Sequence, residues 1–594
     1  MDRIRDGIPA SPGIVIGPVR VLRLEPPPVP HGGGVPVEKV EDEVRRFQEA
    51  CEWVRGDIRR LQESTREHLG DVEAQIFEPQ ILMLEDADLV GGTISYIREN
   101  YLSAERAFEW RVLEWEAQWS HTGHQMVLDK LNDLGDIQAR VLRRLLGIAE
   151  PEVNSLVGED RVILVARDLT PSIAAQLDTS RILGIALDGG TRTSHSSILA
   201  RSLKLPAVVS LGSLSEEIRS GQEIILDGRN GKLVLDPSEE EKTSYRELDF
   251  QSREWEQELL LLAHLESRTQ DDVLIALRAN IDLPGDAIGA RAHGAEGVGL
   301  YRTEFLVVGR STVPLEEEQY TAYRQVLDVY PDQPVIIRTY DLGGDKFPVF
   351  LHMPKEENPF LGWRAIRVCL DEPELFRAQL RALLRAMQHG DVRIMLPLVN
   401  EVSEIRRTRT LLDECAAELR SEGLVMDRPY SLGAMIETPA AALFAPTLAR
   451  HVDFFSIGTN DLVQYALAVD RGNARLAKLY NPFHPAVVRL LHSTIVAGKA
   501  AHIEVSVCGE LAAHPLGAFL LIGLGADSLS VGSSSLAEIK KVIRSISRAQ
   551  ARETASRCLE ASSADEVIAM LVESMQNDLD LSRFAGAWRL SASR

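Results

Sequence analysis

The sequence predicts an α/β protein, in which an α/β domain with an inserted helical bundle is followed by a (β/α)8 TIM barrel. Three observations lead to this prediction. Apolar, strand-like segments stand on both sides of a long helical block, the block repeats apolar residues with a helical period, and the second half of the chain alternates strand-like with helical segments. The expected boundaries are 1–23 and 147–237 for the α/β domain, 24–146 for the helical insert, 238–269 for a helical linker, 270–576 for the barrel and 577–594 for a tail to which the sequence assigns no role.

The first elements are one or two strands at 7–23, where apolar residues alternate and Gly and Pro recur. Residues 24–36 are rich in Pro and Gly, which is typical of a linker. A helical period then begins, and its apolar positions are Val37, Val40, Val44, Phe47, Cys51, Val54, Ile58 and Leu61. This stripe predicts a long amphipathic helix whose apolar face is bundle core rather than a cofactor site, and further helices run to about Leu146.

After the helical block the chain returns to apolar strands separated by turns. The predicted strands lie at 161–165, 182–187, 206–210 and 223–227. The helical block is therefore an insertion into an α/β domain whose first strand lies near the N-terminus. The charged segment 238–269 follows and predicts a helical linker to the second half.

Eight separate strand-like segments occur in the second half, with helical stretches between them. They lie at 273–280, 297–305, 334–340, 392–398, 431–437, 453–459, 504–508 and 527–531. Strands that alternate with helices indicate a parallel sheet, and eight such units over about 300 residues indicate a closed barrel. The active site is then expected at the C-terminal ends of the strands, called the barrel mouth below.

Composition narrows the class of function. A formal net charge of −23 argues against a nucleic-acid binder and is compatible with a basic protein partner. The five cysteines lack CxxC spacing, which argues against a disulfide framework or a zinc site and for a reducing compartment. The charged N-terminus does not have the apolar core of a signal peptide, and no apolar run approaches the length of a membrane span. We therefore expect a cytoplasmic protein without membrane insertion.

His195 lies in a polar turn, Gly189-Gly190-Thr191-Arg192-Thr193-Ser194-His195-Ser196-Ser197, just before an apolar helical pattern. Free backbone N–H groups and the helix dipole at such a helix start favour an anion such as phosphate. Thr193 could hydrogen-bond one ring nitrogen and leave the other as a nucleophile. A capped helix with a solvated histidine is the ordinary alternative for this pattern.

Charged residues follow five of the predicted barrel strands. The segments are Arg302-Thr303-Glu304, Arg338-Thr339-Tyr340-Asp341, Glu437-Thr438-Pro439, Gly458-Thr459-Asn460-Asp461 and Cys508-Gly509-Glu510. Arginines at the mouth suit a substrate that carries both carboxylate and phosphate, and two carboxylates on neighbouring strands suit Mg²⁺. Cys508 is open to two interpretations, a small buried residue or a thiol that carries a proton to or from carbon.

Taken together, these motifs resemble Enzyme I of the bacterial phosphoenolpyruvate-dependent sugar phosphotransferase system, over nearly the whole chain. The segments that carry the resemblance are Gly7-Ile8-Pro9-Ala10-Ser11-Pro12-Gly13, Ile76-Phe77-Glu78, Leu82-Met83-Leu84-Glu85-Asp86, Thr193 to Arg201, Asn358 to Arg367, and Gly458-Thr459-Asn460-Asp461-Leu462. The barrel motifs are also similar to those of pyruvate phosphate dikinase and phosphoenolpyruvate synthase.

The resemblance implies a Mg²⁺-dependent enzyme that transfers the phosphoryl group of phosphoenolpyruvate to its own histidine and then to an HPr-like carrier protein, releasing pyruvate. By the same resemblance, His195 is phosphorylated and Cys508 protonates the enolate carbon. Phosphoenolpyruvate would be bound by Arg302, Arg338, Asn460, Asp461 and Arg471, with Glu437 and Asp461 holding the metal. The resemblance further implies that the helical insert docks the carrier, with Glu78, Met83, Leu84, Glu85 and Asp86 in the docking region, and that the protein is a homodimer through its barrel.

Several segments depart from the family pattern. Thr191 replaces a usual glycine, Glu78-Pro79-Gln80 replaces a segment that often carries Gly-His, Val531-Gly532-Ser533-Ser534-Ser535 is unusual after the last strand, and the tail extends past the usual end. The sequence also leaves rival functions: a nitrogen-branch-like regulatory phosphotransferase, a phospho-carrier that only senses phosphoenolpyruvate, and an ATP-charged dikinase or synthase. The last is disfavoured because no GxxxxGK[ST] loop is present.

Overall fold

The computed structural model describes residues 3–22, 26–30, 34–69, 74, 77–120, 125–149, 161–169, 173, 177–190, 197, 200, 203, 205–307, 313–343, 351, 356–425, 427–471, 473–476 and 478–584. The chain divides into two compact units, Met1–Ser252 and Arg253–Arg594. No helix among the described residues is long and apolar enough to cross a membrane.

The first unit contains an eight-stranded sheet in its described part, in the order β1-β8-β7-β3-β4-β5-β6-β2. The strands are β1 (Ile4–Asp6), β2 (Ile8–Ser11), β3 (Ile14–Leu22), β4 (Val162–Ala166), β5 (Ile182–Leu187), β6 (Ala207–Val209), β7 (Glu223–Asp227) and β8 (Lys232–Leu235). β3 pairs antiparallel with β7 and parallel with β4. Parallel neighbours need a crossover connection. Here the whole helical block fills that connection, which confirms a bundle inserted into an α/β domain.

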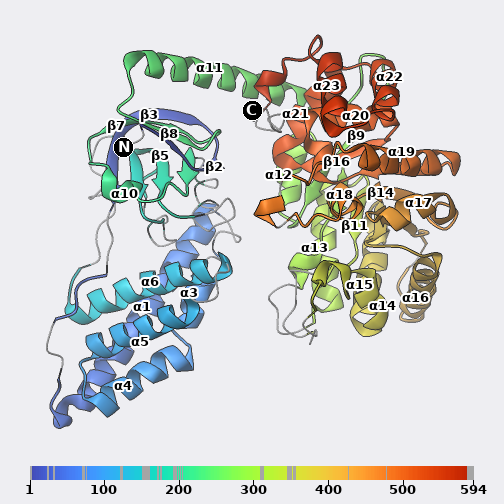
Figure 1. The fold of residues 1–594 in the computed structure, drawn as a ribbon. Helices are drawn as coiled ribbons and strands as arrows, with labels where there is room; N and C mark the ends of the chain where they lie inside the picture. Colours follow the sequence, from blue (N-terminus) through green and yellow to red (C-terminus); the bar gives the residue numbers. More distant parts are fainter. Residues whose placement is uncertain are drawn as a thin grey trace. The chain divides into compact units, whose positions relative to one another are not determined.

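Helices make up the inserted block (Figure 1). They are α1 (Val40–Leu69), α3 (Glu78–Met83), the single turn η3 (Ala87–Gly91), α4 (Gly92–Asn100), α5 (Ala104–Ser120) and α6 (Gln125–Leu146). The predicted stripe of α1 is core: Phe47, Val54 and Ile58 are fully buried, and the rings of Phe47 and Phe108 lie 5.4 Å apart. Val37 is instead exposed, because it precedes α1 in the short turn η1 (Val37–Lys39).

The charged segment after the sheet forms one long helix, α11 (Glu239–Leu262), as the predicted linker requires. Three glutamates in its first turn suit the positive end of the helix dipole. Near its C-terminal end, Trp255 packs edge-on against Phe584 with ring centroids 5.3 Å apart. Phe584 is 2% exposed and belongs to the barrel core, so the part of the tail up to that residue is built into the second unit.

Eight parallel strands close into a barrel in the second unit, and each lies within or overlaps one predicted segment. They are β9 (Ala276–Ile281), β10 (Val298–Tyr301), β11 (Val335–Arg338), β12 (Val392–Leu396), β13 (Ser431–Ile436), β14 (Phe454–Ile457), β15 (Glu504–Val507) and β16 (Ser528–Gly532). The barrel closes by pairing of β16 with β9. This confirms the predicted (β/α)8 fold.

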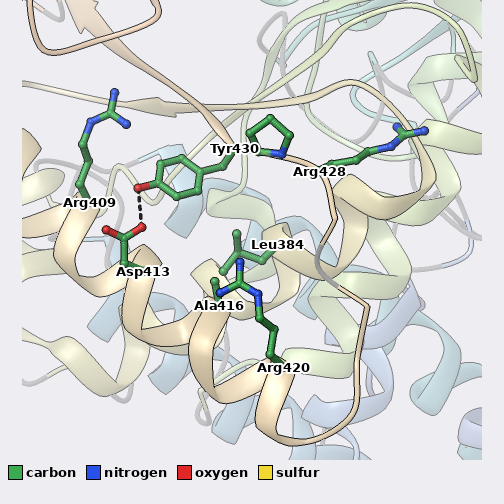
Figure 2. A pocket seen from close by; sticks show the side chains of 8 residues that line it. Leu384, Arg409, Asp413, Ala416, Arg420, Arg428 and Tyr430 are labelled. Atoms are coloured by element: carbon green, nitrogen blue, oxygen red, sulfur yellow. Dashed lines mark hydrogen bonds between the residues drawn. The ribbon is translucent and has the colours of Figure 1, made fainter.

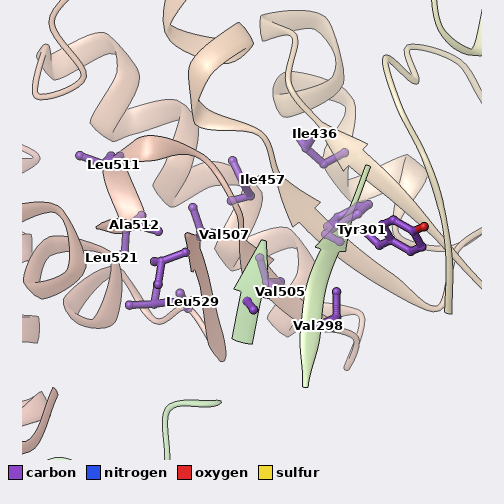
Figure 3. Close-up of a cluster of buried hydrophobic side chains, with 14 of the residues drawn as sticks. Val298, Tyr301, Ile436, Ile457, Val505, Val507, Leu511, Ala512, Leu521 and Leu529 are labelled. Atoms are coloured by element: carbon purple, nitrogen blue, oxygen red, sulfur yellow. The ribbon is translucent and has the colours of Figure 1, made fainter. Parts of the chain in front are cut away.

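Helices connect the barrel strands and bury one face of each. The main ones are α12 (Asp286–Ala292), α13 (Glu316–Val329), α14 (Ile366–Asp371), α15 (Pro373–Ala386), α16 (Val402–Ser421), α17 (Pro439–Leu448), α18 (Thr459–Leu467), α19 (Pro485–Ala500), α20 (Pro515–Leu524), α21 (Leu536–Ser545), α22 (Arg548–Cys558) and α23 (Ala564–Met575). Strand residues such as Val298, Val505 and Leu529 contribute to the large apolar core (Figure 3). Residues that alternate with these form a second, smaller cluster inside the barrel: Leu300, Ile336, Met395, Met435, Phe454 and Cys508.

Candidate active site at the barrel mouth

The predicted barrel residues collect at one end because each follows the C-terminal end of a parallel strand. They are Arg302 after β10, Arg338 at the end of β11, Glu437 after β13, Asn460 and Asp461 in the first turn of α18 after β14, and Cys508 after β15. Arg471 follows α18, and its Nη1 lies 3.7 Å from Asp461 Oδ1. His195 and Thr193 belong to the first unit and lie outside the described residues.

Arg338 is held by two carboxylates deep in the mouth. Its Nη2 donates to Glu304 Oε1 at 2.9 Å, and its Nη1 lies 3.2 Å from Asp341 Oδ2. Burial by itself lowers the pKa of Arg338, but the neighbouring carboxylates of Glu304 and Asp341 outweigh it and raise the pKa above its usual value. The guanidinium therefore stays charged and fixed in direction.

A second buried arginine, Arg364, completes the network. Its Nη2 donates to Asp341 Oδ1 at 2.9 Å and to Asp461 Oδ2 at 3.2 Å, and its Nη1 donates to Tyr465 Oη at 3.1 Å. Burial lowers the pKa of Arg364, and Asp341 and Asp461 raise it by more. Arg364 lies within the segment Asn358 to Arg367 that carries the family resemblance, but no role was predicted for it from the sequence.

Glu437 lies at the centre of this charged cluster and is 2% exposed. Its Oε1 accepts a hydrogen bond from the backbone N–H of Leu398 at 2.6 Å. Burial, together with the nearby carboxylates of Asp461 and Asp341, raises the pKa of Glu437 to about 8, against the opposing effect of Arg338 and Arg364. Arg338 and Arg364 therefore do not fully offset the effects of burial and of the neighbouring carboxylates on Glu437.

At two glycines, Gly343 and Gly458, the backbone passes close to the side chains of the charged cluster. A Cβ on Gly458 would lie 2.8 Å from Glu437 Oε2, and Gly343, at φ +122°, could not carry one without meeting Arg364 at 2.3 Å. Two non-glycine residues also adopt positive φ beside the cluster, Leu398 at 54° and Ala365 at 56°. Strained backbone of this kind persists where the surroundings impose it, often at functional sites.

Arg302 and Arg471 are more exposed than the buried pair. Arg302 Nη1 lies 2.9 Å from Asp282 Oδ1, and the side chains of Arg302 and Arg471 are 36% and 41% exposed. Asn460 is fixed by Glu510, whose backbone N–H donates to Asn460 Oδ1 at 2.9 Å. Two arginines thus remain accessible to an anion at the rim, while two lie beneath it.

Cys508 is 3% exposed and lies in the interior cluster beside the charged network. Its thiol faces the carbonyl oxygen of Ile457 at 3.6 Å. Burial raises the pKa of the Cys508 thiol. Cys508 is thus a small buried residue that keeps its proton at neutral pH, and its role as a proton donor stays a prediction.

The chemistry of the carboxylates fits a divalent cation. Asp461 Oδ1 is buried and accepts no hydrogen bond from the part of the chain that the structure describes. No group of three or more His, Cys, Asp and Glu side chains among the described residues is arranged to hold a metal by itself. Mg²⁺ needs only one or two carboxylates and takes its other ligands from water and substrate oxygens. Glu437 and Asp461 are therefore suitable Mg²⁺ ligands.

Three residues of the network, Glu304, Asp341 and Arg364, were missing from the predicted site. The signal for two of them was present, because Glu304 and Asp341 stand in the segments that follow β10 and β11. Their roles depend on which charges become buried against one another, and a pattern of strand ends does not contain that information.

Family models of three parts match this chain. They are the phosphoenolpyruvate-utilising enzyme N-terminal domain over 6–126, the mobile domain over 158–231 and the phosphoenolpyruvate-binding domain over 256–548. A phosphoenolpyruvate-protein phosphotransferase of Priestia megaterium is 40% identical over 95% of this chain and 97% of its own. The chain belongs to this family.

A second relative has a similar sequence identity over nearly the full length of this chain, and a solved structure matches part of it. The phosphoenolpyruvate-protein phosphotransferase of Haemophilus influenzae is 39% identical over 96% of this chain and 98% of its own. A solution structure of Enzyme I (nEIt) is 29% identical, covers 42% of this chain and 99% of that one, and has a TM-score of 0.34. The three family models and the two phosphotransferases cover both halves of the chain, and the charged network at the mouth falls within the match to the phosphoenolpyruvate-binding domain.

Proposed function

We propose that this protein is a phosphoenolpyruvate-protein phosphotransferase, which catalyses the first step of a sugar phosphotransferase system. The observation that carries the proposal is the similarity over 95% of the chain to a protein of that activity. The arrangement of the mouth supports it, because two rim arginines and two buried ones suit a substrate with both a phosphate and a carboxylate.

The reaction divides between the two units. The P–O bond of phosphoenolpyruvate breaks while a P–N bond forms to a ring nitrogen of His195, most simply Nε2, and enolpyruvate remains in the barrel. Cys508 then gives its thiol proton to the enolate carbon, which yields pyruvate, and the thiol recovers a proton from solvent. Arg302, Arg338, Asn460, Asp461 and Arg471 bind and orient the substrate.

Glu437 and Asp461 would hold Mg²⁺. When bound, the metal neutralises phosphate charge and so assists the departure of the enolate. The support for this assignment is that Glu437 and Asp461 follow the neighbouring strands β13 and β14, and that the buried Asp461 Oδ1 accepts no hydrogen bond from the described chain. A divalent cation there would also lower the raised pKa of Glu437.

An HPr-like protein would accept the phosphoryl group from His195 after docking on the helical insert. The structure changes which residues are available for that contact. Met83 and Leu84 are buried in the bundle, Asp86 caps the following helical turn, and Glu85 pairs with Arg59 at 3.1 Å. Leu82, 58% exposed on α3, remains as the accessible apolar residue of the segment.

We also propose a cytoplasmic homodimer that associates through the barrel unit. Large apolar side chains are exposed on that unit, among them Leu315 and Leu361. Sedimentation equilibrium measures the association directly, and a monomer at micromolar concentration would contradict it.

The decisive experiment is labelling with radioactive phosphoenolpyruvate and Mg²⁺. The wild type should acquire one acid-labile phosphate per chain, and His195→Ala should acquire none. His293→Ala provides the matched control, because His293 is an exposed histidine whose ring forms one hydrogen bond within the described chain, with Gly289 O of the preceding helix. Persistent labelling of His195→Ala, or loss of labelling in His293→Ala, would refute the assignment.

A further inference from the structure

A cavity of about 380 Å³ lies in the barrel unit at the opposite end of β13 from Glu437. Its wall combines α15, α16 and the residues just before β13 (Figure 2). Pro429 and Tyr430 enter β13, whereas Glu437 follows it, so the strand separates this cavity from the mouth. We call it the lower cavity.

One face of α16 supplies half of the lining. Arg409, Asp413, Ala416 and Arg420 recur at steps of four, three and four residues, which places them on a single stripe of the helix. Arg428 stands on the opposite wall. The lower cavity therefore has three arginines and one carboxylate, in a chain whose net charge is −23.

Arg420 is exposed, and its guanidinium is not paired with a carboxylate of the described chain. The acidic residues of the neighbouring face of α16 are engaged elsewhere, since Glu414 lies 2.7 Å from Arg377 and Glu422 lies 2.7 Å from Arg381. The Arg420 side chain forms no hydrogen bond or ion pair with any residue that the structure describes, and Figure 2 shows its guanidinium beside Leu384 and Ala416. A guanidinium fork in such a place suits a phosphate or carboxylate.

The other end of the lower cavity holds Asp413, Tyr430 and Arg409, and the charge of Arg409 is paired with Asp453. Tyr430 donates its hydroxyl hydrogen to Asp413 Oδ1 at 2.8 Å, which fixes both side chains (Figure 2). Arg409 is also fixed, donating to the carbonyl oxygen of His451 at 3.1 Å and to Asp453 Oδ2 at 3.3 Å. Asp413 Oδ2 accepts no hydrogen bond within the described chain, so it can accept one from a ligand hydroxyl.

We propose that the lower cavity binds a hydroxyl-bearing phosphate ester of sugar-phosphate size, with its phosphate on Arg420 and a hydroxyl group on Asp413. Arg428 also lines the cavity, on the segment that leads to Tyr430, and its Nη1 lies 3.5 Å from the carbonyl oxygen of Met387 (Figure 2). A simple polyanion fits less well, because Asp413 would repel a second anionic group at the opposite end. This ligand is separate from the substrate proposed for the mouth.

Calorimetric titration of the full-length protein tests the proposal, with ribose 5-phosphate, ribose and inorganic phosphate as probes. Ribose 5-phosphate should bind more tightly than inorganic phosphate, and ribose should not bind. Arg420→Gln should lower the affinity for ribose 5-phosphate by about tenfold or more, since the substitution removes a charge-assisted contact. Asp413→Asn should remove most of the preference for ribose 5-phosphate over inorganic phosphate.

Two controls separate the lower cavity from other sites. Arg406→Gln changes an exposed arginine of α16 that does not line the cavity, and it should leave the affinity unchanged. Arg302→Gln alters the mouth, and this variant should still bind ribose 5-phosphate at the lower cavity. Three results with the variants would overturn the proposal: loss of binding in Arg302→Gln, no effect of Arg420→Gln, or equal weakening of binding by Arg406→Gln. Two results with the probes would also overturn it. These are tighter binding of citrate than of ribose 5-phosphate through the same residues, and no binding of any probe at millimolar concentration.

Discussion

At the residue scale, the mouth is a case of charges that fix one another. Arg338 and Arg364 share Asp341, which lies 3.2 Å from the first and 2.9 Å from the second. Removing one member of such a buried set leaves another charge uncompensated, which costs more than the pair itself contributes. The two arginines therefore present a rigid surface, and a substrate meets donors whose positions are already set.

Glu437 gives a prediction about pH. Its pKa is raised from the ordinary 4.5 to about 8, so the folded protein holds this proton more tightly than the unfolded chain does. The resulting contribution to stability is fully present at pH values below the pKa of Glu437 in the unfolded chain, and it is lost as pH rises through about 8. Glu437→Gln imitates the protonated form, so without Mg²⁺ it should exceed the wild type in stability by roughly 1–3 kcal/mol at about pH 9 and by less at about pH 5.

Chemical denaturation across this pH range measures the difference. Mg²⁺ at about pH 9 should stabilise the wild type more than Glu437→Gln. Glu504 provides a control of opposite sign. Burial by itself raises its pKa, but Arg278 and Arg393, each 2.7 Å away, outweigh burial and lower the pKa to about 2. The contribution of Glu504 to stability is present above about pH 4.5 and is lost as pH falls through about 2. Glu504→Gln should therefore destabilise the protein at neutral pH. A Glu437→Gln variant that is less stable at high pH would contradict the argument.

Cys508 gives a second prediction at this scale. Cys508→Ala should lower the free energy of unfolding by only about 1 kcal/mol, because a small buried side chain is removed. Pyruvate formation should fall by about 10² to 10⁴, the usual contribution of a positioned acid. Thermal unfolding measured beside turnover distinguishes the roles, and a large loss of stability with near-normal turnover would show that Cys508 serves only as core.

At the scale of elements, the barrel was predictable, whereas strands β1 and β8 of the sheet were not predicted. Barrel strands are apolar and bounded by helices, so their segments stand out along the chain. In contrast, β1 has one apolar residue in three, and β8 is a four-residue strand joined to β7 by a short turn. β1 is paired because β8 offers it an edge, and its own three residues give little local signal. β8 is apolar at three of four positions, but it is shorter than the segments that were predicted.

The same contrast applies to the mouth and the bundle. A position after a strand predicted which side chains gather, whereas the part played by Arg364 depends on a loop that folds back to meet Asp341 and Asp461. In the bundle, the sequence grouped Met83 and Leu84 with a docking surface, but helical geometry turns both inward. Periodicity identifies an apolar face without saying which apolar residues of a short helix remain outside.

Leu82 therefore carries the prediction for the bundle. Leu82→Ala should slow phosphoryl transfer to an HPr-like carrier about three- to tenfold through weaker docking, while labelling of the protein by phosphoenolpyruvate continues. Leu113→Ala is the matched control, since Leu113 lies on α5 with 52% exposure against 58% for Leu82. Carrier-dependent transfer at varied carrier concentration gives the answer, and equal effects of the two variants would place the docking surface elsewhere.

At the scale of the whole molecule, two compact units have separate hydrophobic cores. The barrel core includes Trp255 of α11 and Phe584 of the tail, whereas the bundle and the sheet have clusters of their own. Substrate binding in the barrel should stabilise that unit alone, because a ligand that binds only the folded form shifts only the equilibrium to which it is coupled. Division into units thus predicts how the full-length protein unfolds.

Scanning calorimetry of the His195→Ala variant, which prevents turnover, should show more than one transition. Phosphoenolpyruvate with Mg²⁺ should raise only the barrel transition, by a few degrees at concentrations near 100 times the dissociation constant, where binding contributes about 2.7 kcal/mol. Phe584→Ala identifies that transition, since it removes a side chain that is 2% exposed in the barrel core and should lower the same peak. If the ligand instead raised every transition equally, the two units would unfold together and the separation of binding from phosphoryl acceptance would fail.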